Sequence, residues 1–373
     1  MSDWTEYKLG ELIKLKYGKD HKPLQDGIIP AYGSGGIMRF VNQAIYKGPS
    51  ILIPRKGSLN NVIYINTPFW TVDTMFWSII NEEIVDSRFL YYAICKYNFE
   101  DLNVGSAIPS LTVPVIEAVR VKLPTKEIQT RIADIIDSVN EKIDTNRKIN
   151  ARLEELAQAI FKSWFIDFEP FGGKMPEDWA NFKVGEVSTI NERQYSLHEN
   201  WTDFQYLDTG NITENIIGKL YKFSNNNDLP SRARRKVKEF DIIYSTVRPN
   251  QRHFGLILNP DKNWLVSTGF AVISAKQSYI NSFYLYMVIS QKKVSEYLQS
   301  LGEQATSTYP SVNATDIANL EIMVPDLELQ NQFGLIISKI FQLKNTLEQE
   351  SSRLAALRDT LLPKLMSGEL LPE

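Results

Sequence analysis

The sequence predicts a mixed α/β (α+β) protein with an internal repeat, in which each of two α/β domains is followed by a long helix. Three observations predict this. Segments that begin at Pro124 and Pro325 match each other at a constant offset of 201 positions. Both segments have the apolar spacing of a long helix, and short β-branched runs come before each. The predicted parts are two α/β domains (residues 1–122 and 171–323) and two helical regions (123–170 and 324–373).

Length and composition fit this division. The 373 residues are 43% apolar, which is enough to bury more than one core. The single cysteine, Cys95, excludes a disulfide within the chain and suits a reducing compartment. We expect no signal peptide at the start and no membrane partner, because apolar runs such as 283–289 are too short to span a bilayer. The expected location is the cytoplasm.

The repeat needs no gap over about forty residues. The matching positions are Pro124, Glu127, Gln129, Ile135, Ile136, Arg152, Leu153 and Leu156 in the first copy, and Pro325, Glu328, Gln330, Ile336, Ile337, Arg353, Leu354 and Leu357 in the second. The same offset pairs Pro109-Ser110 with Pro310-Ser311. The domain starts also match, at Asp3-Trp4, Lys8 and Gly10-Glu11 against Asp178-Trp179, Lys183 and Gly185-Glu186.

Each duplicated segment is predicted to be one long helix with a 4-3 apolar seam, the pattern of a helix pair. The seam positions are Ile132, Ile136, Val139, Ile143, Leu153 and Ile160 in the first helix, and Phe333, Ile337, Ile340, Leu347, Leu354, Leu361 and Leu365 in the second. Polar residues interrupt both seams, namely Asn146, Asn150, Lys344, Ser351 and Arg358. Such positions cost stability but fix the register and the partner. Separate amphipathic helices on separate cores are the alternative.

The two domains repeat an order of elements without repeating the sequence. Strands are predicted at Ser50 to Ile53 and Val62 to Ile65 in the first domain, and at Ile242 to Thr246 and Gly255 to Leu258 in the second. A helix follows in each, capped by Asp86-Ser87 or Asn281-Ser282. Each domain then closes with a Pro-Ser loop, a short strand and the proline before the long helix. The two copies therefore share a scaffold and differ in their surfaces.

The helical segments resemble a known family. Residues 152–170 (RLEELAQAIFKSWFIDFEP) resemble the central conserved region of type I restriction–modification specificity subunits. Residues 357–370 (LRDTLLPKLMSGEL) resemble the C-terminal conserved region of the same subunits. Together with the two-copy layout, the resemblance extends over the whole chain.

The resemblance implies both an architecture and partners. The two α/β domains would be target recognition domains, each reading one half of a bipartite site in double-stranded DNA. The long helices would pack as an antiparallel coiled coil with pseudo-two-fold symmetry and would dock two methyltransferase subunits. Restriction (translocase) subunits would join that core. S-adenosylmethionine, ATP and Mg²⁺ would act in the partners, with no cofactor in this chain.

Catalytic motifs are absent from the sequence. There is no phosphate-binding loop, because no lysine follows the glycine-rich segment at residues 33–36 in the required position. There is no Asn-Pro-Pro-Tyr-like methyltransferase motif, and neither Pro260-Asp261 nor Pro325-Asp326 is followed by the Glu-x-Lys of a nuclease. Three scattered histidines and one cysteine make no zinc site. We expect a non-catalytic recognition subunit without a metal.

Three alternatives stay open. The partner could fuse methylation and cleavage in one chain, which the same helices would serve. The chain could be a helical scaffold that does not bind DNA. A self-sufficient methyltransferase is disfavoured by the missing cofactor motifs.

Candidate DNA-contacting residues lie in loops that combine glycine with basic and amide side chains. Glycine lets the backbone approach phosphates, arginine pairs with guanine, and asparagine or glutamine pairs with adenine. In the first domain the candidates are Tyr32, Gly33, Ser34, Gly35, Arg39, Arg55 and Lys56. In the second they are Thr209, Asn211, Arg232, Arg234, Arg235, Thr246, Arg248, Asn250, Gln251 and Arg252.

The residues from Ser231 to His253 are the strongest basic segment. They contain seven basic and two acidic side chains, a local charge of +5 in a chain whose net charge is −3. The loop at residues 245–253 is expected to occupy the same place in the repeat as Arg55-Lys56. The aromatic residues Trp164, Phe165 and Phe168 are predicted instead to be core or partner-docking residues.

Overall fold

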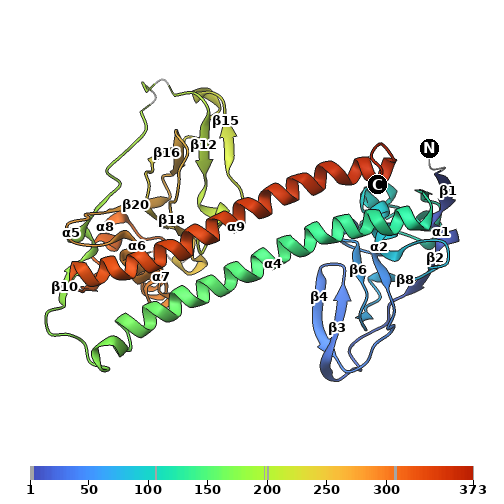
Figure 1. Cartoon of the computed structure of the whole chain (residues 1–373), viewed down its shortest axis with the longest axis horizontal. Helices are drawn as coiled ribbons and strands as arrows, with labels where there is room; N and C mark the ends of the chain where they lie inside the picture. Colours follow the sequence, from blue (N-terminus) through green and yellow to red (C-terminus); the bar gives the residue numbers. More distant parts are fainter. Residues whose placement is uncertain (1–3, 106, 197, 200, 306–308, 373) are drawn as a thin grey trace. The chain divides into compact units, whose positions relative to one another are not determined.

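The computed structural model describes residues 4–105, 107–196, 198–199, 201–305 and 309–372 (Figure 1). The chain forms two compact units. The first comprises Met1–Asn146 and Glu350–Glu373, and the second comprises Arg147–Gln349. Each unit therefore contains one α/β domain and one part of each long helix, α4 (Lys126–Phe165) and α9 (Leu327–Ser367). The four parts predicted from the sequence were defined by the internal repeat, whereas these two units are defined by compactness. The four-part division stays a prediction.

The first unit contains three small sheets. Their strand orders are β2-β8-β5-β6, β4-β3-β7 and β1-β9. The strands are β1 (Thr5–Lys8), β2 (Ile13–Tyr17), β3 (Asp26–Gly33), β4 (Gly36–Val41), β5 (Ser50–Pro54), β6 (Ile63–Ile65), β7 (Trp70–Thr71), β8 (Met75–Ile80) and β9 (Arg120–Leu123). The helices besides α4 are α1 (Leu9–Leu12), α2 (Ser87–Cys95), the short η1 (Phe99–Leu102) and α3 (Val113–Glu117). Neighbouring strands are antiparallel except β3 and β7, which are parallel.

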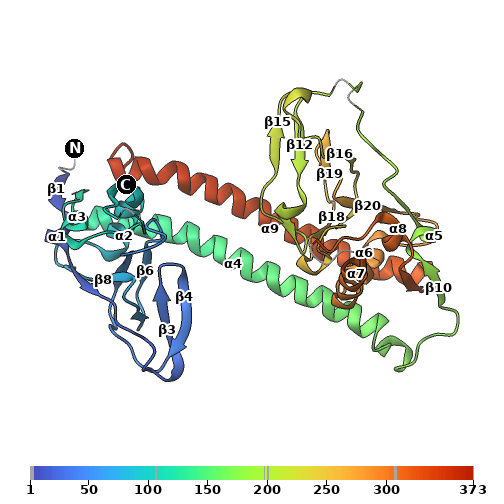
Figure 2. The same ribbon diagram turned by 180° about the vertical axis from the view of Figure 1, so that it is seen from behind.

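The second unit repeats this plan with a larger second sheet (Figure 2). Its strand orders are β11-β20-β17-β18, β15-β12-β19-β16, β10-β21 and β13-β14. The strands are β10 (Ala180–Lys183), β11 (Ser188–Ile190), β12 (Phe204–Leu207), β13 (Ile212–Thr213), β14 (Ile216–Ile217), β15 (Tyr221–Phe223), β16 (Ala233–Lys236), β17 (Ile242–Ser245), β18 (Phe254–Leu256), β19 (Trp264–Ser267), β20 (Phe270–Ala275) and β21 (Glu321–Val324). The remaining helices are η2 (Glu169–Phe171), α5 (Val184–Val187), η3 (Thr209–Asn211), η4 (Asn226–Asp228), η5 (Pro249–Gln251), α6 (Ser282–Ile289), α7 (Lys292–Ala305) and α8 (Ala314–Ala318).

One central strand in each unit is buried on both faces. Along β5, Ile51 and Ile53 pack into the main core of the first unit, while Leu52 packs into a second cluster on the opposite face. Along β17, Ile242 and Tyr244 enter the main core and Ile243 the opposite cluster. Side chains alternate between the faces of a strand, so a continuous apolar run is stable only when both faces are covered. This explains why these two runs were recognisable in the sequence.

The two long helices contact each other within each unit. In the first unit, the side chain of Asn146 donates to Glu350 at 2.7 Å, and Arg358 donates to Asn140 at 3.0 Å. In the second, Lys344 pairs with Glu154, and the rings of Phe161 and Phe333 lie 6.0 Å apart. Higher numbers on α4 meet lower numbers on α9, so the segments run antiparallel in each unit. Several predicted seam residues are buried, among them Ile132, Ile136, Ile143, Phe333, Ile337 and Ile340.

The predicted elements are present with small shifts. The expected strands correspond to β5, β6, β17 and β18, although β18 begins at Phe254 and ends at Leu256. Both predicted helix caps are confirmed. Asp86 accepts from the amide of Phe89 at 3.1 Å, and Asn281 accepts from that of Phe283 at 2.9 Å. The extra sheets β4-β3-β7 and β15-β12-β19-β16 were not predicted, because their strands carry little regular apolar alternation.

Two further observations concern the long helices. Phe165 is buried, and Trp164 and Phe168 pack against the same core, which confirms the core interpretation of these aromatics. Pro363 does not end α9, which continues to Ser367. The helix stops at Gly368, whose φ of 78° suits a glycine at a helix end. Among the described residues, no helix is long and apolar enough to cross a membrane.

Candidate nucleic-acid interface

The arginine-rich loop of the second domain joins β17 to β18. After β17 ends at Ser245, the chain makes the short helix η5, and β18 begins at Phe254. Arg248 and Arg252 flank η5, and both have positive φ angles, 47° and 57°. Left-handed backbone is costly for a residue other than glycine. The loop therefore has a specific backbone conformation that its contacts must stabilise.

The same backbone junction occurs in both domains. The carbonyl of Arg55 accepts from the amide of Leu111 at 2.9 Å, and the carbonyl of Thr246 accepts from that of Val312 at 2.8 Å. The amide of Gly57 donates to Pro109 at 3.1 Å, and the amide of Arg248 donates to Pro310 at 2.8 Å. In each domain a strand-end loop is thus clamped to the Pro-Ser loop.

This junction refines the predicted equivalence. The arginine-rich loop does occupy the place of the Arg55-Lys56 loop, but the residues correspond with a shift. Arg55 corresponds to Thr246, and Gly57 corresponds to Arg248. Lys56 corresponds to Val247, since these residues make matching bridges to Ser110 and Ser311. The basic side chains of the two loops are therefore attached at different positions of the shared backbone junction.

The two arginines of the second loop have different surroundings. The guanidinium of Arg252 pairs with Glu214 and donates to Ser295 Oγ at 3.2 Å and to the carbonyl of Ser290 at 3.1 Å. That of Arg248 lies 4.6 Å from the ring centroid of Tyr309, which is 62% exposed. Arg252 fixes the loop to the domain. Arg248 is half-buried beside Tyr309, an aromatic residue that was not a sequence-predicted site residue.

Other predicted residues of the second domain converge on the turn between β19 and β20. Thr246 donates to the carbonyl of Gly269 at 2.9 Å, and the carbonyl of Arg232 accepts from the amide of Thr268 at 2.9 Å. Thr209 is also adjacent, because a Cβ built on Gly269 would lie 2.8 Å from its methyl group. The tertiary structure thus brings together three segments that are far apart in the sequence.

The remaining candidates of this domain are less uniform. Asn211 lines a shallow hollow at the β13–β14 hairpin. Asn250 and Gln251 are exposed on η5. Arg234 donates to the carbonyl of Ala233 at 3.2 Å, and burial lowers the pKa of Arg235. Within β16, the Arg234 side chain is therefore partly occupied, and Arg235 is half-buried.

In the first domain the glycine-rich candidate segment is the tip of the β3–β4 hairpin. Gly33 pairs with Gly36, and the carbonyl of Ser34 accepts from the side chain of Asn61 at 2.8 Å. Arg39 is held by Asp26 at 2.6 Å and by the carbonyl of Leu24 at 3.1 Å. Tyr32 lies one residue before this tip and pairs with Thr71 of β7.

A hollow of about 710 Å³ lies beside the hairpin tip. The predicted residues Gly33, Ser34 and Gly35 line it. The lining residues that sequence reasoning missed are Asp20, His21, Lys22, Met38, Val72, Asp73 and Thr74. Arg55 lies near this region, donating to the carbonyl of Asp73 at 3.3 Å. Its guanidinium is also 5.4 Å from the ring centroid of Tyr17. Lys56 is exposed.

Comparison with known proteins identifies the family. The sequence matches the type I restriction modification DNA specificity domain over residues 1–155 and 176–355. The chain belongs to this family. Its candidate DNA-contacting loops are therefore those of a DNA specificity protein, and the two matched segments begin with the two α/β domains.

Individual relatives agree. This specificity-family chain is 24% identical to the type I restriction enzyme MjaIX specificity subunit of Methanocaldococcus jannaschii, over 87% of this chain and 78% of the relative. It is 24% identical to the HindI specificity subunit of Haemophilus influenzae, over 99% of this chain and 100% of the relative. The crystal structure of a type I restriction–modification S subunit from M. genitalium has the same fold, with a TM-score of 0.67 at 17% identity, covering 100% of this chain and 97% of that one.

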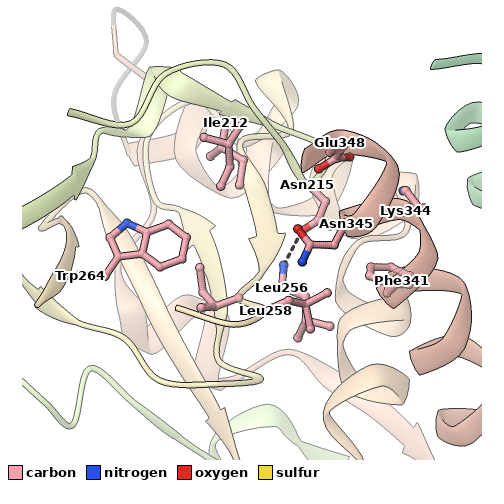
Figure 3. A pocket seen from close by; sticks show the side chains of 11 residues that line it. Ile212, Asn215, Leu256, Leu258, Trp264, Phe341, Lys344, Asn345 and Glu348 are labelled. Carbon is pink, nitrogen blue, oxygen red and sulfur yellow. Dashed lines mark hydrogen bonds between the residues drawn. The ribbon is translucent and has the colours of Figure 1, made fainter. Parts of the chain in front are cut away.

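A second cavity of the specificity-family fold lies between the second domain and its part of α9 (Figure 3). Trp264, Leu256 and Leu258 face Phe341, Lys344 and Glu348 across it, and Asn215 accepts from the amide of Leu256 at 2.7 Å. Burial raises the pKa of Glu348, and the charge of Lys344 opposes that shift. None of the predicted DNA-contacting residues lines this cavity. It belongs to the packing of the domain on the helix. The described residues contain no cluster of potential metal ligands.

Proposed function

We propose that this chain reads a bipartite site in double-stranded DNA through two target recognition domains, one half-site for each. The observation that carries the proposal is the shared junction between strand-end loop and Pro-Ser loop. Its backbone hydrogen bonds are the same in both domains, while the side chains that leave it differ. A common frame with different exposed groups is what two readers of two different half-sites need.

We further propose that the long helices form an antiparallel coiled coil with pseudo-two-fold symmetry. This coiled coil would set the half-site spacing and would dock two methyltransferase subunits. The contacts of two buried polar residues, Asn146 with Glu350 and Lys344 with Glu154, support a fixed register. Restriction subunits would join this core. S-adenosylmethionine, ATP and Mg²⁺ would act in the partners, and the chain itself would direct the chemistry without performing it.

The test is to express the chain alone and together with the methyltransferase encoded beside it. Alone, it is expected neither to methylate or cleave DNA nor to hydrolyse ATP. With its partner, sequencing of methylated DNA should show two short half-sites separated by a fixed spacer. Turnover by the pure chain, or partner methylation at the same sites without the chain, would contradict the proposal. A partner that also cleaves would identify the fused system.

A further inference from the structure

Arg248 and Tyr309 form a cation–π pair at the junction of the second domain. The centre of the guanidinium lies 4.6 Å from the ring centroid, and 62% of Tyr309 is exposed. We propose that Tyr309 orients Arg248 so that the edge of the guanidinium reads a guanine in the half-site of the second domain. This inference rests on the proposed function. It names the nucleobase that Arg248 would read and the residue that would position Arg248.

Stacking determines which part of the arginine is available. The guanidinium carbon lies over the ring. When a guanidinium stacks on an aromatic ring, one of its faces is covered and its N–H donors lie in the plane, directed outward from its edge. Within the described parts of the chain, no hydrogen bond or ion pair involves the Arg248 side chain. Guanine presents two acceptors, O6 and N7, along its edge in the major groove, and a guanidinium edge matches both. A tyrosine that fixes the plane of the arginine reduces the entropy lost on binding.

The backbone at Arg248 supports a role for its side chain. Its φ angle is 47°, in the left-handed region where glycine is favoured. At the corresponding junction of the first domain the residue is Gly57, with a φ of 90°. Glycine would thus fulfil the structural requirement at this position. An arginine there adds conformational cost, and strain of this kind concentrates at functional sites.

The neighbouring arginine gives a contrast within one loop. Arg252 is also left-handed, but Glu214, Ser295 and Ser290 engage its guanidinium. Its donors are used inside the domain, so it shapes the loop that presents Arg248. Of these two arginines, the geometry favours Arg248 as the reader.

The first domain contains a similar pair at a different position. The guanidinium of Arg55 lies 5.4 Å from the ring of Tyr17, and 55% of Tyr17 is exposed. Arg55 corresponds to Thr246 in the backbone junction, not to Arg248. In the first domain, an arginine next to an exposed tyrosine therefore also lies in the strand-end loop, but at a different position of that loop.

The test uses the complex of the full chain with its methyltransferase partner. Binding is measured at one salt concentration to duplexes in which each base of the second half-site is varied in turn. The variants are Arg248→Gly, Tyr309→Ala and Tyr309→Phe. The control is Tyr279→Ala, since Tyr279 is 56% exposed in the same domain but belongs to the loop that contacts Gln330.

Arg248→Gly is expected to keep the melting temperature, because glycine suits the backbone, yet to lose about 5- to 150-fold of the preference for guanine at one position. Tyr309→Ala should lose part of the same preference at the same position, while Tyr309→Phe and the control should keep it. The first half-site should be read as before in every variant.

Several results would overturn the inference. An equal loss of affinity on all sequences would make Arg248 a phosphate contact. Unchanged discrimination in Arg248→Gly would remove it from base reading, and unchanged discrimination in Tyr309→Ala would remove the positioning role. Failure of the proposed function is distinguishable, because the unmodified complex itself would then show no sequence preference.

Discussion

The backbone amide of Asn281 donates a 2.9 Å hydrogen bond to the side chain of Gln330 in the first turns of α9. The same glutamine donates to the carbonyl of Pro325 at 2.7 Å. Gln129 does the same in the first unit, accepting from Asp86 at 2.9 Å and donating to Pro124 at 2.9 Å. Both glutamines are essentially fully buried. Each ties the start of a long helix to the capped helix of its domain.

Replacing Gln330 with alanine should therefore weaken the second unit. The change leaves the buried carbonyl of Pro325 and the amide of Asn281 without these partners, which costs about 1–3 kcal/mol of unfolding free energy. Urea unfolding of the purified chain measures the loss. Gln342→Ala is the control, since Gln342 is exposed on the same helix. Equal stability of the two variants would show that the buried contacts contribute nothing.

Arg252→Ala should destabilise the second domain without changing which base is read. The substitution removes contacts to Glu214, Ser295 and Ser290, for an expected loss of about 1–3 kcal/mol. Arg248→Ala is the matched control in the same loop and should cost less. Thermal unfolding gives the comparison. If Arg252→Ala kept full stability and relaxed one base of the half-site, Arg252 would be a reader after all.

Exchange of residues 171–323 with the corresponding block of another specificity subunit should change one half-site only. The block contains both β10 and all but the last residue of β21, which pair with each other from Ala180 to Val324. Its ends therefore meet within the domain. Sequencing of DNA methylated by the chimera with its partner is the measurement. A chimera that altered both half-sites would contradict independent reading.

Lengthening the paired helices should lengthen the spacer. Four residues inserted after Lys148 in α4 and four after Leu347 in α9 add roughly 6 Å to each helix. They leave the contacts of Asn146 with Glu350 and of Lys344 with Glu154 intact. One or two base pairs at about 3.4 Å each match that length. Methylated sites should keep both half-sites and gain one or two base pairs between them.

The insertion rotates one domain only slightly about the helix axis, whereas each added base pair rotates the DNA by about a tenth of a turn. The domains or the duplex must therefore absorb some strain. Reduced affinity is compatible with the prediction. The control is the same insertion after Gly173, in the loop beyond α4, which lengthens neither helix. A folded double insertion that methylated only the original spacing would show that the helices do not set it.

The sequence by itself determined the elements whose signals are local or repeated. The long helices follow from apolar spacing, and the caps at Asp86 and Asn281 from residue type. The central strands β5 and β17 follow from continuous apolar runs buried on both faces. The matched Gln129 and Gln330 identified two copies of one scaffold without any knowledge of their contacts.

Only the tertiary structure decided which candidate side chains use their hydrogen-bond donors inside the domain. Arg248 and Arg252 look alike in the sequence, yet Arg252 is engaged by Glu214, distant in the chain, while Arg248 stacks on Tyr309. The correspondence between Arg248 and Gly57 is defined by backbone hydrogen bonds to the Pro-Ser loop. These contacts join residues at least 38 positions apart, and a local pattern carries no information about them.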